Sequence, residues 1–157
     1  MSAPDRCEHC GAALRKYWKP ITPGLIDILI KFRSAVVSNN RNKIHLLKDM
    51  SLDPVEYTNF QKLRYHGLVT KYKEKNEQGE LVWQRGYWLL TRRGVQFLRN
   101  EIAIPQKVQT LRNRVVDHDA RQVTVSDVIG TTPYVETIDE LEWDRATKEE
   151  ALQQSLL

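Results

Sequence analysis

Cysteine is scarce in this sequence, which has only two among 157 residues. Cys7 and Cys10 are too few to form the framework of disulfides that stabilises small exported domains. The N-terminal stretch MSAPDRCEHC also lacks a basic segment followed by an apolar one, which is the pattern of an export signal. These absences predict a cytoplasmic protein.

Long apolar runs and the common catalytic motifs are absent as well. The most apolar run, GLIDILI at 24–30, is interrupted by Asp27, and no segment approaches the roughly 20 apolar residues that cross a bilayer. The sequence has no glycine-rich phosphate loop, no His-Glu-x-x-His pattern and no Gly-x-Ser-x-Gly turn. We therefore expect neither a membrane protein nor an enzyme.

Charge, by contrast, is present and unevenly distributed. Residues 1–105 hold 18 Lys and Arg against 10 Asp and Glu, a net charge of +8. Residues 106–157 hold 6 against 10, which gives −4 and leaves +4 for the whole chain. A basic body with an acidic tail suits a domain that binds a polyanion. The alternative is a solvated surface with a tail that aids solubility.

The chain divides into four parts. Residues 1–20 form a head around Cys-x-x-Cys, residues 21–100 a periodic body, residues 101–130 an added β-hairpin and residues 131–157 an acidic tail. In the hairpin we predict two strands, KVQTLRNRVV and RQVTVSDVI, joined by a turn at DHDA. This extension would either supply the interface of a homodimer or pack on its own domain and cover an edge strand.

Two helices are predicted at the start of the body. Thr22 and Pro23 are a good helix start, because the first offers a side-chain acceptor and the second has no amide to leave unpaired. An apolar stripe then follows at helical spacing, and it is broad enough for a helix packed on two sides: Leu25, Ile28, Leu29, Phe32 and Val36, widened by Ile26, Ile30 and Val37. KIHLLKDM at 43–50 predicts a short second helix with Ile44, Leu47 and Met50 facing inward.

The third predicted helix begins at Asp53. Asp53 is a good N-cap, Pro54 fits the first helical position and Glu56 completes a capping box. Stepping 100° per residue places Phe60 and Leu63 on the inward face. Hydrogen-bonding and basic side chains take the opposite face, namely Thr58, Gln61, Lys62 and Tyr65, with Tyr57, Asn59 and Arg64 on the flanks. Gly67 is placed to end the helix in a left-handed conformation.

After Gly67 the hydrophobic period changes from helix to strand. Val69, Lys71, Lys73 and Lys75 share one strand face, NEQG is a turn, and a second strand alternates Trp83, Arg85, Tyr87 and Leu89. Thr91 then caps a closing helix. The sum is an α+β domain of three helices, a β-ribbon and a closing helix, with a core predicted to contain Leu29, Phe32, Phe60, Leu63 and Leu98.

This order of elements resembles the winged helix-turn-helix family of DNA-binding domains. The resemblance is carried by FQKLRYHGLV at 60–69 and GYWLLTRRGVQFL at 86–98, and it covers residues 21–100, about half of the chain. In this family the third helix enters the major groove and the wing contacts the backbone or minor groove. The resemblance implies a double-stranded DNA-binding protein, a prokaryotic or phage-type transcriptional regulator. It implies that the side chains in contact with the major groove are Thr58, Asn59, Gln61, Lys62 and Tyr65. It implies that the wing contacts DNA through Lys71, Lys73, Lys75 and Arg85.

The chemistry of these side chains fits that assignment. Asn and Gln can pair with adenine and Lys can donate to guanine, whereas a row of lysines meets phosphates without reading sequence. Two alternatives remain, because a fold does not fix a function. One is a protein-interaction adaptor that combines a winged helix with the head, and the other is a nucleic-acid processing accessory with little sequence preference.

The CEHCG stretch resembles one knuckle of a zinc ribbon. A closed structural zinc site needs four ligands, and the chain has no cysteine besides Cys7 and Cys10. His45 or His66 could complete the site if the head folds back over the body, or two chains could each donate their cysteine pair. Without either, the motif is an unligated knuckle. A redox role is disfavoured because the motif does not stand between a strand and a helix.

The zinc hypothesis can be tested by elemental analysis of protein purified without chelator. Zinc in stoichiometric amount is expected if a site is completed, and Cys10→Ser should then release it because it removes a thiolate ligand. Comparing His45→Ala with His66→Ala would show which histidine contributes. Metal-free protein would support the unligated knuckle.

Overall fold

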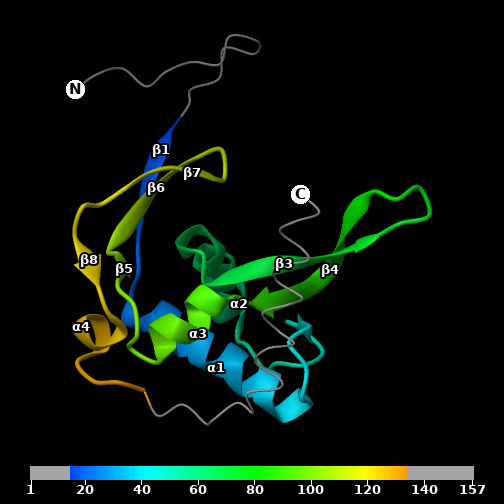
Figure 1. The fold of residues 1–157 in the computed structure, drawn as a ribbon, viewed down its shortest axis with the longest axis horizontal. Helices are drawn as coiled ribbons and strands as arrows, with labels where there is room; N and C mark the ends of the chain where they lie inside the picture. Colours follow the sequence, from blue (N-terminus) through cyan, green and yellow to red (C-terminus); the bar gives the residue numbers. More distant parts are fainter. Residues whose placement is uncertain (1–14, 134–157) are drawn as a thin grey trace.

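The computed structural model describes residues 15–133 and shows an α+β fold with small antiparallel sheets. The sheets have strand orders β1-β6-β7, β2-β4-β3 and β5-β8. The first sheet and the β3–β4 ribbon lie on either side of the helices (Figure 1). The strands are β1 (Lys16–Pro20), β2 (Ile44–His45), β3 (Val69–Lys75), β4 (Leu81–Leu90), β5 (Ile104–Pro105), β6 (Lys107–Leu111), β7 (Arg114–His118) and β8 (Gln122–Val123). The helices are α1 (Pro23–Asn39), α2 (Pro54–Phe60), the 3₁₀ helix η1 (Gln61–His66), α3 (Arg92–Leu98) and α4 (Val125–Ile129).

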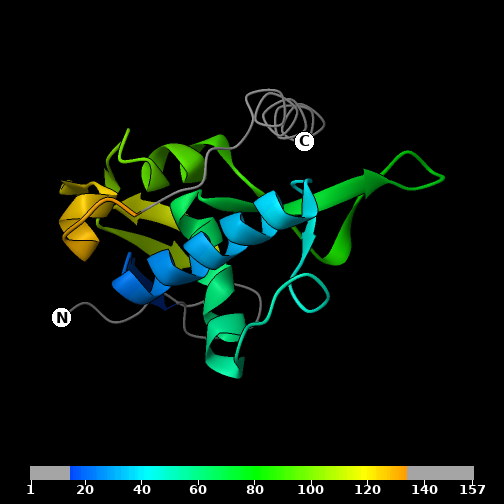
Figure 2. The same cartoon turned by 90° about the horizontal axis from the view of Figure 1, so that it is seen from below.

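Helix α1 crosses the body and supplies much of its core (Figure 2). The Thr22 hydroxyl accepts a hydrogen bond from the Leu25 amide at 3.2 Å, which confirms the predicted cap. The predicted core is confirmed too, because all five of its members have no exposed surface: Leu29, Phe32, Phe60, Leu63 and Leu98. No helix between residues 15 and 133 combines the length and apolar character needed to cross a membrane.

The predicted second helix is wrong. Ile44 and His45 instead form strand β2, which pairs with β4, and a turn follows. Two local contacts favour this turn over a helix: Asp49 accepts a hydrogen bond from the His45 amide at 2.8 Å, and Nδ1 of His45 accepts from the Leu47 and Lys48 amides at 3.2 and 3.1 Å. Ile44 is buried as predicted, but Leu47 is 69% exposed.

The third helix starts as predicted and then tightens. Asp53 and Glu56 form the capping box, with the Glu56 amide 2.8 Å from an Asp53 carboxylate oxygen. From Gln61 onward the chain is a 3₁₀ helix rather than the continuous α-helix predicted, and it ends at Gly67 with φ +74°. A 3₁₀ helix has three residues per turn, so Phe60, Leu63 and His66 line up on one face. All three are buried.

The ribbon forms as predicted, but β4 is irregular. Lys71 pairs with Trp88 and Lys73 with Trp83, so residues 84–87 stand opposite Tyr72 alone. The predicted alternation on β4 is therefore wrong. Trp83 turns to the core side, where its ring lies 5.8 Å from that of Trp88, while Tyr87 faces His45 at 4.8 Å on the other side.

Gly86 makes this irregularity possible. Its φ is +82°, and a Cβ at this position would lie only 2.5 Å from Nε2 of His45. A larger residue would therefore be strained and would collide with the imidazole ring.

The extension differs from its prediction in two ways. Its hairpin turns at Arg112 and Asn113, which have φ of 50° and 63°, and not at DHDA. The predicted second strand is wrong because residues 121–129 contain only β8 and then α4, which begins at a capping box of Thr124 and Asp127. The hairpin packs on its own domain: β6 pairs with β1, which lies in the segment assigned to the head.

Helix α3 lies so close to β3 that Gly94 has no space for a side chain. A Cβ there would lie 2.4 Å from the Leu68 carbonyl oxygen. We expect Gly94→Ala to lower the free energy of unfolding by about 1–3 kcal/mol or more, because rigid backbone must move. Gly24→Ala is the matched control, since its nearest atom lies 3.9 Å away. Urea titrations of both variants provide the measurement, and equal stabilities would contradict this packing.

Candidate nucleic-acid interface

A continuous row of cations and aromatic rings runs from β1 across η1 to β3. We call it the basic band and define it as Lys19, Arg64 and Lys71 with the rings of Tyr65 and Trp83. Lys19 Nζ lies 5.4 Å from the Tyr65 ring centre, and the Arg64 guanidinium lies 4.8 Å from the same ring. Lys71 Nζ lies 4.3 Å from the Trp83 ring. Such contacts hold cations in place by attraction to the ring face.

The basic band is not neutralised within residues 15–133, where none of its cations pairs with a carboxylate. Other cations do pair, as Lys31 does with Glu56. Burial, followed by repulsion from Arg64 and Lys73, lowers the pKa of Lys71. Like charges thus lie close enough together to oppose one another. A polyanion placed on the band would relieve that repulsion.

Tyr65 holds the band together. Its hydroxyl donates to Oδ1 of Asn113 at 3.1 Å and accepts from Nη2 of Arg64 at 3.1 Å. The ring is thus fixed between η1 and the turn that joins β6 to β7. Its hydroxyl and its ring thus already have partners within the protein, and the contact of Tyr65 with the major groove stays a prediction.

The other groove residues named from the sequence differ in exposure. Gln61 and Lys62 are exposed, and Lys62 has no partner in the described part of the chain. Thr58 is exposed too, but its hydroxyl donates to the Pro54 carbonyl at 2.9 Å. Asn59 is half-buried and borders a groove. Asn59 and Lys62 therefore line the same groove, whereas Thr58 and Gln61 are not part of its lining.

The residues assigned to the wing also differ from one another in exposure and position. Lys71 belongs to the basic band, whereas Lys73 is half-buried. Lys75, the last residue of β3, and Arg85, within β4, are exposed. On the other side of β3, Tyr72 donates to Glu74 at 2.6 Å, and Glu74 pairs with Lys43.

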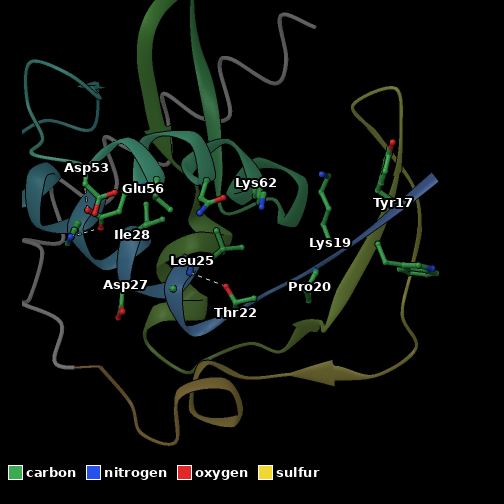
Figure 3. Close-up of a pocket in the computed structure, with 15 residues that line it drawn as sticks. Tyr17, Lys19, Pro20, Thr22, Leu25, Asp27, Ile28, Asp53, Glu56 and Lys62 are labelled. Atoms are coloured by element: carbon green, nitrogen blue, oxygen red, sulfur yellow. Dashed lines mark hydrogen bonds and ion pairs between the residues drawn. The ribbon is translucent and has the colours of Figure 1, made fainter. Parts of the chain in front are cut away.

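A groove of about 540 Å³ opens beside the band, between β1, α1 and α2 (Figure 3). Its floor includes Leu25 and Ile28. Lys19 and Lys62 stand at one end, and acidic residues stand at the other (Figure 3). The groove is therefore cationic where it meets the basic band. The acidic residues in its lining are Asp27, Asp53 and Glu56.

Sequence reasoning missed Lys19 and Arg64. Lys19 was assigned to the head, because nothing local shows that β1 pairs with β6. Arg64 was placed on the flank of an α-helix, and the 3₁₀ geometry brings it beside Tyr65 instead. The stretch KYWK at 16–19 carried a usable signal, since it combines lysines with aromatic residues.

The proposed metal ligands Cys7 and Cys10 lie outside the described residues. Within residues 15–133, no three His, Cys, Asp or Glu side chains are grouped to hold a metal ion. Both candidate histidines are engaged by the body. Nδ1 of His45 accepts two backbone hydrogen bonds, and His66 is only 3% exposed. Either would have to leave its present surroundings to bind zinc with the head.

No protein-family model, curated protein or solved structure matches this chain. The assignment therefore depends on the composition and geometry of the site. Cations interleaved with aromatic rings are typical of surfaces that bind nucleic acids, and hydrogen-bonding side chains beside them can contact bases.

His66 makes the stability of η1 depend on pH. Its two ring nitrogens have no hydrogen-bond partner, and burial, with a smaller contribution from Arg93, lowers its pKa from 6.5 to about 4. Between these values the unfolded chain binds a proton that the folded chain excludes. Stability should therefore fall by about 3 kcal/mol as the pH drops from 6.5 to 4.

Urea titrations across this pH range test the effect of His66. His66→Leu should flatten the dependence, whatever its stability at neutral pH. Of the carboxylates with lowered pKa, Asp127 acts below this window because its ordinary value is 3.8, whereas Glu74, with an ordinary value of 4.5, contributes at its lower end and does so equally in the variant. An unchanged slope in the variant would contradict the role of His66.

Proposed function

We propose that this protein binds double-stranded DNA and acts as a regulator of transcription. The observation that carries the proposal is the basic band, in which Lys19, Arg64 and Lys71 are held by aromatic rings without a carboxylate partner in residues 15–133. Phosphates supply most of the affinity in protein–DNA complexes. A row of cations that are held in place and have no carboxylate partner in the described residues suits binding to these phosphates.

The arrangement of elements supports a winged-helix reading of the body. A helical segment, α2 with η1, precedes the β3–β4 ribbon, and β4 lies between β2 and β3 in the sheet. A turn replaces the second helix of the family pattern. In this reading α2 and the start of η1 approach the major groove, and the ribbon lies along the backbone.

The exposure of the side chains indicates that the helical segment and the basic band would have different roles on DNA. Gln61 and Lys62 are the exposed side chains best suited to base edges, with Thr58 and Asn59 beside them. The basic band would contact phosphates and set the orientation of the helix. Tyr65 would act as the anchor of the band.

An adaptor that binds another protein is the second candidate. It is favoured by two apolar side chains that α2 exposes, Val55 at 68% and Tyr57 at 38%. The two functions differ in their response to salt, because DNA binding releases counterions and weakens steeply as salt rises. An adaptor would show no affinity for duplex DNA near physiological salt.

A salt titration on two duplexes, one selected from a random library and one scrambled, tests the DNA-binding proposal. Lys71→Gln should weaken binding to both alike and lower the salt slope by about 1, because one phosphate contact is lost. Gln61→Ala should cost roughly 1–3 kcal/mol on the selected duplex alone. Arg99→Gln is the matched control, since it removes the same charge from a residue that already pairs with Glu101.

Two outcomes would contradict the proposal. Absence of binding to either duplex at about 50 mM salt, where phosphate contacts are strong, would leave the adaptor function. Equal effects of Lys71→Gln and Arg99→Gln would show that net charge matters and the basic band does not.

A further inference from the structure

Strand β1 presents different aromatic residues on its two faces. Neighbouring residues of a strand point to opposite sides, so Tyr17 and Lys19 share one face and Trp18 takes the other. Lys19 contacts Tyr65, which places the Tyr17 face toward η1. Figure 3 shows Tyr17 and Lys19 on the same side of the strand. Trp18 instead lies beside Lys107, whose Nζ is 5.0 Å from its ring.

Tyr17 lies beside the β1 end of the basic band and is not part of it. The Nζ of Lys19 lies 5.9 Å from the Tyr17 ring and 5.4 Å from the Tyr65 ring, so it stands between the two. Tyr65 is fixed by its hydrogen bonds, but Tyr17 is 54% exposed and borders the groove. The cationic end of the groove thus has the exposed Tyr17 ring, Lys19, Lys62 and the Asn59 amide, and Trp18 also borders it with Lys107 over its ring.

We propose that this end of the groove binds unpaired DNA, so that the preferred ligand is a duplex with a single-stranded extension. The inference rests on the proposed function, because the duplex part would contact Gln61, Arg64 and Lys71, while Lys19, Asn59 and Lys62 contact the unpaired extension. An unpaired base would stack on Tyr17, its flanking phosphates would meet Lys19 and Lys62, and Asn59 would reach the base edge. Stacking on aromatic rings beside cations is how single strands are commonly held.

The chemistry favours an unpaired strand over a second duplex. Bases inside a duplex already stack on their neighbours and offer no free face to Tyr17, whereas every unpaired base does. The groove also favours one position for the bound segment. Asp27, Asp53 and Glu56 outnumber the one cation at the far end, Lys31, which pairs with Glu56, so phosphates would be favoured at the end with Lys19 and Lys62.

Fluorescence anisotropy with three DNA ligands tests the inference. The ligands are a blunt duplex, the same duplex with a tail of about ten nucleotides, and the free single strand. The full-length protein should bind the tailed duplex about tenfold more tightly than the blunt one, from stacking of a single base. Tyr17→Ala should abolish this advantage and leave blunt-duplex binding unchanged, whereas Tyr17→Phe should keep it.

Trp18→Ala is the comparison variant, because Trp18 also borders the groove but points to the opposite face of the strand, where Lys107 lies over its ring. It should leave the advantage of the tailed duplex intact. Thermal unfolding of each variant separates a loss of binding from a loss of folding. Equal weakening by Tyr17→Ala and Trp18→Ala would overturn the proposed site.

The same three DNA ligands distinguish the proposed single-strand site at Tyr17 from the proposed binding of duplex DNA. Equal binding of blunt and tailed duplexes by the unmodified protein would overturn the inference and leave duplex binding standing. Binding of the free strand in a manner that requires Tyr17, without binding of the blunt duplex, would overturn the proposed function and support the Tyr17 site.

Discussion

The change from α-helix to 3₁₀ helix at Gln61 determines the geometry of the whole candidate interface. With three residues per turn, Phe60, Leu63 and His66 fall on one buried face. The remaining positions then separate into two further faces, one with Lys62 and Tyr65 and one with Gln61 and Arg64. In a continuous α-helix, residues three positions apart would be offset by about 60°, whereas the 3₁₀ helix aligns them. The core therefore positions the site through a local change of helical period.

This arrangement concentrates positive charge at some energetic cost. Lys71 is partly buried near Arg64 and Lys73, and burial together with these two cations lowers its pKa. Aromatic rings offset part of that repulsion, since contacts of this kind stabilise by roughly 0.5–1 kcal/mol or more each. His66, beneath the same segment, has no hydrogen-bond partner for its ring. Unfavourable features of this sort are expected where a surface is shaped for a ligand rather than for stability.

Local signals made much of the fold predictable. The caps at Thr22, Asp53 and Thr91 and the end of η1 at Gly67 follow from side chains within three or four residues of the backbone they satisfy. The core of α1 follows from its helical period. These features need no knowledge of distant segments, and they located the helical segment and the ribbon that carry most of the site.

The features that could not be predicted depend on contacts between distant residues. Strand β1 exists because it pairs with β6, and Thr110 bonds to the Tyr17 carbonyl across 93 positions of sequence. Residues 43–50 have an apolar pattern compatible with a helix, but pairing of Ile44 with Trp88 draws them into a strand. The irregularity of β4 requires the close approach of His45 to Gly86. In each of these three segments, contacts with distant residues override the conformation that the local sequence favours.

The helical segment at the centre of the site is joined to its two neighbours by different chemistry. On the ribbon side, Phe60 packs against the Trp88 ring at 5.2 Å within the core, and both residues are essentially unexposed. On the β1 side, the join consists of the exposed bond from Tyr65 to Asn113 and the cation above the Tyr65 ring.

Apolar burial of this kind is little affected by salt, whereas exposed polar and charged contacts stabilise by about 1 kcal/mol and weaken as salt rises. The ribbon end of the basic band is therefore the rigid end, and the β1 end is the adjustable one. A rigid end suits the regular spacing of duplex phosphates. An adjustable end suits a single strand, whose backbone takes no fixed form.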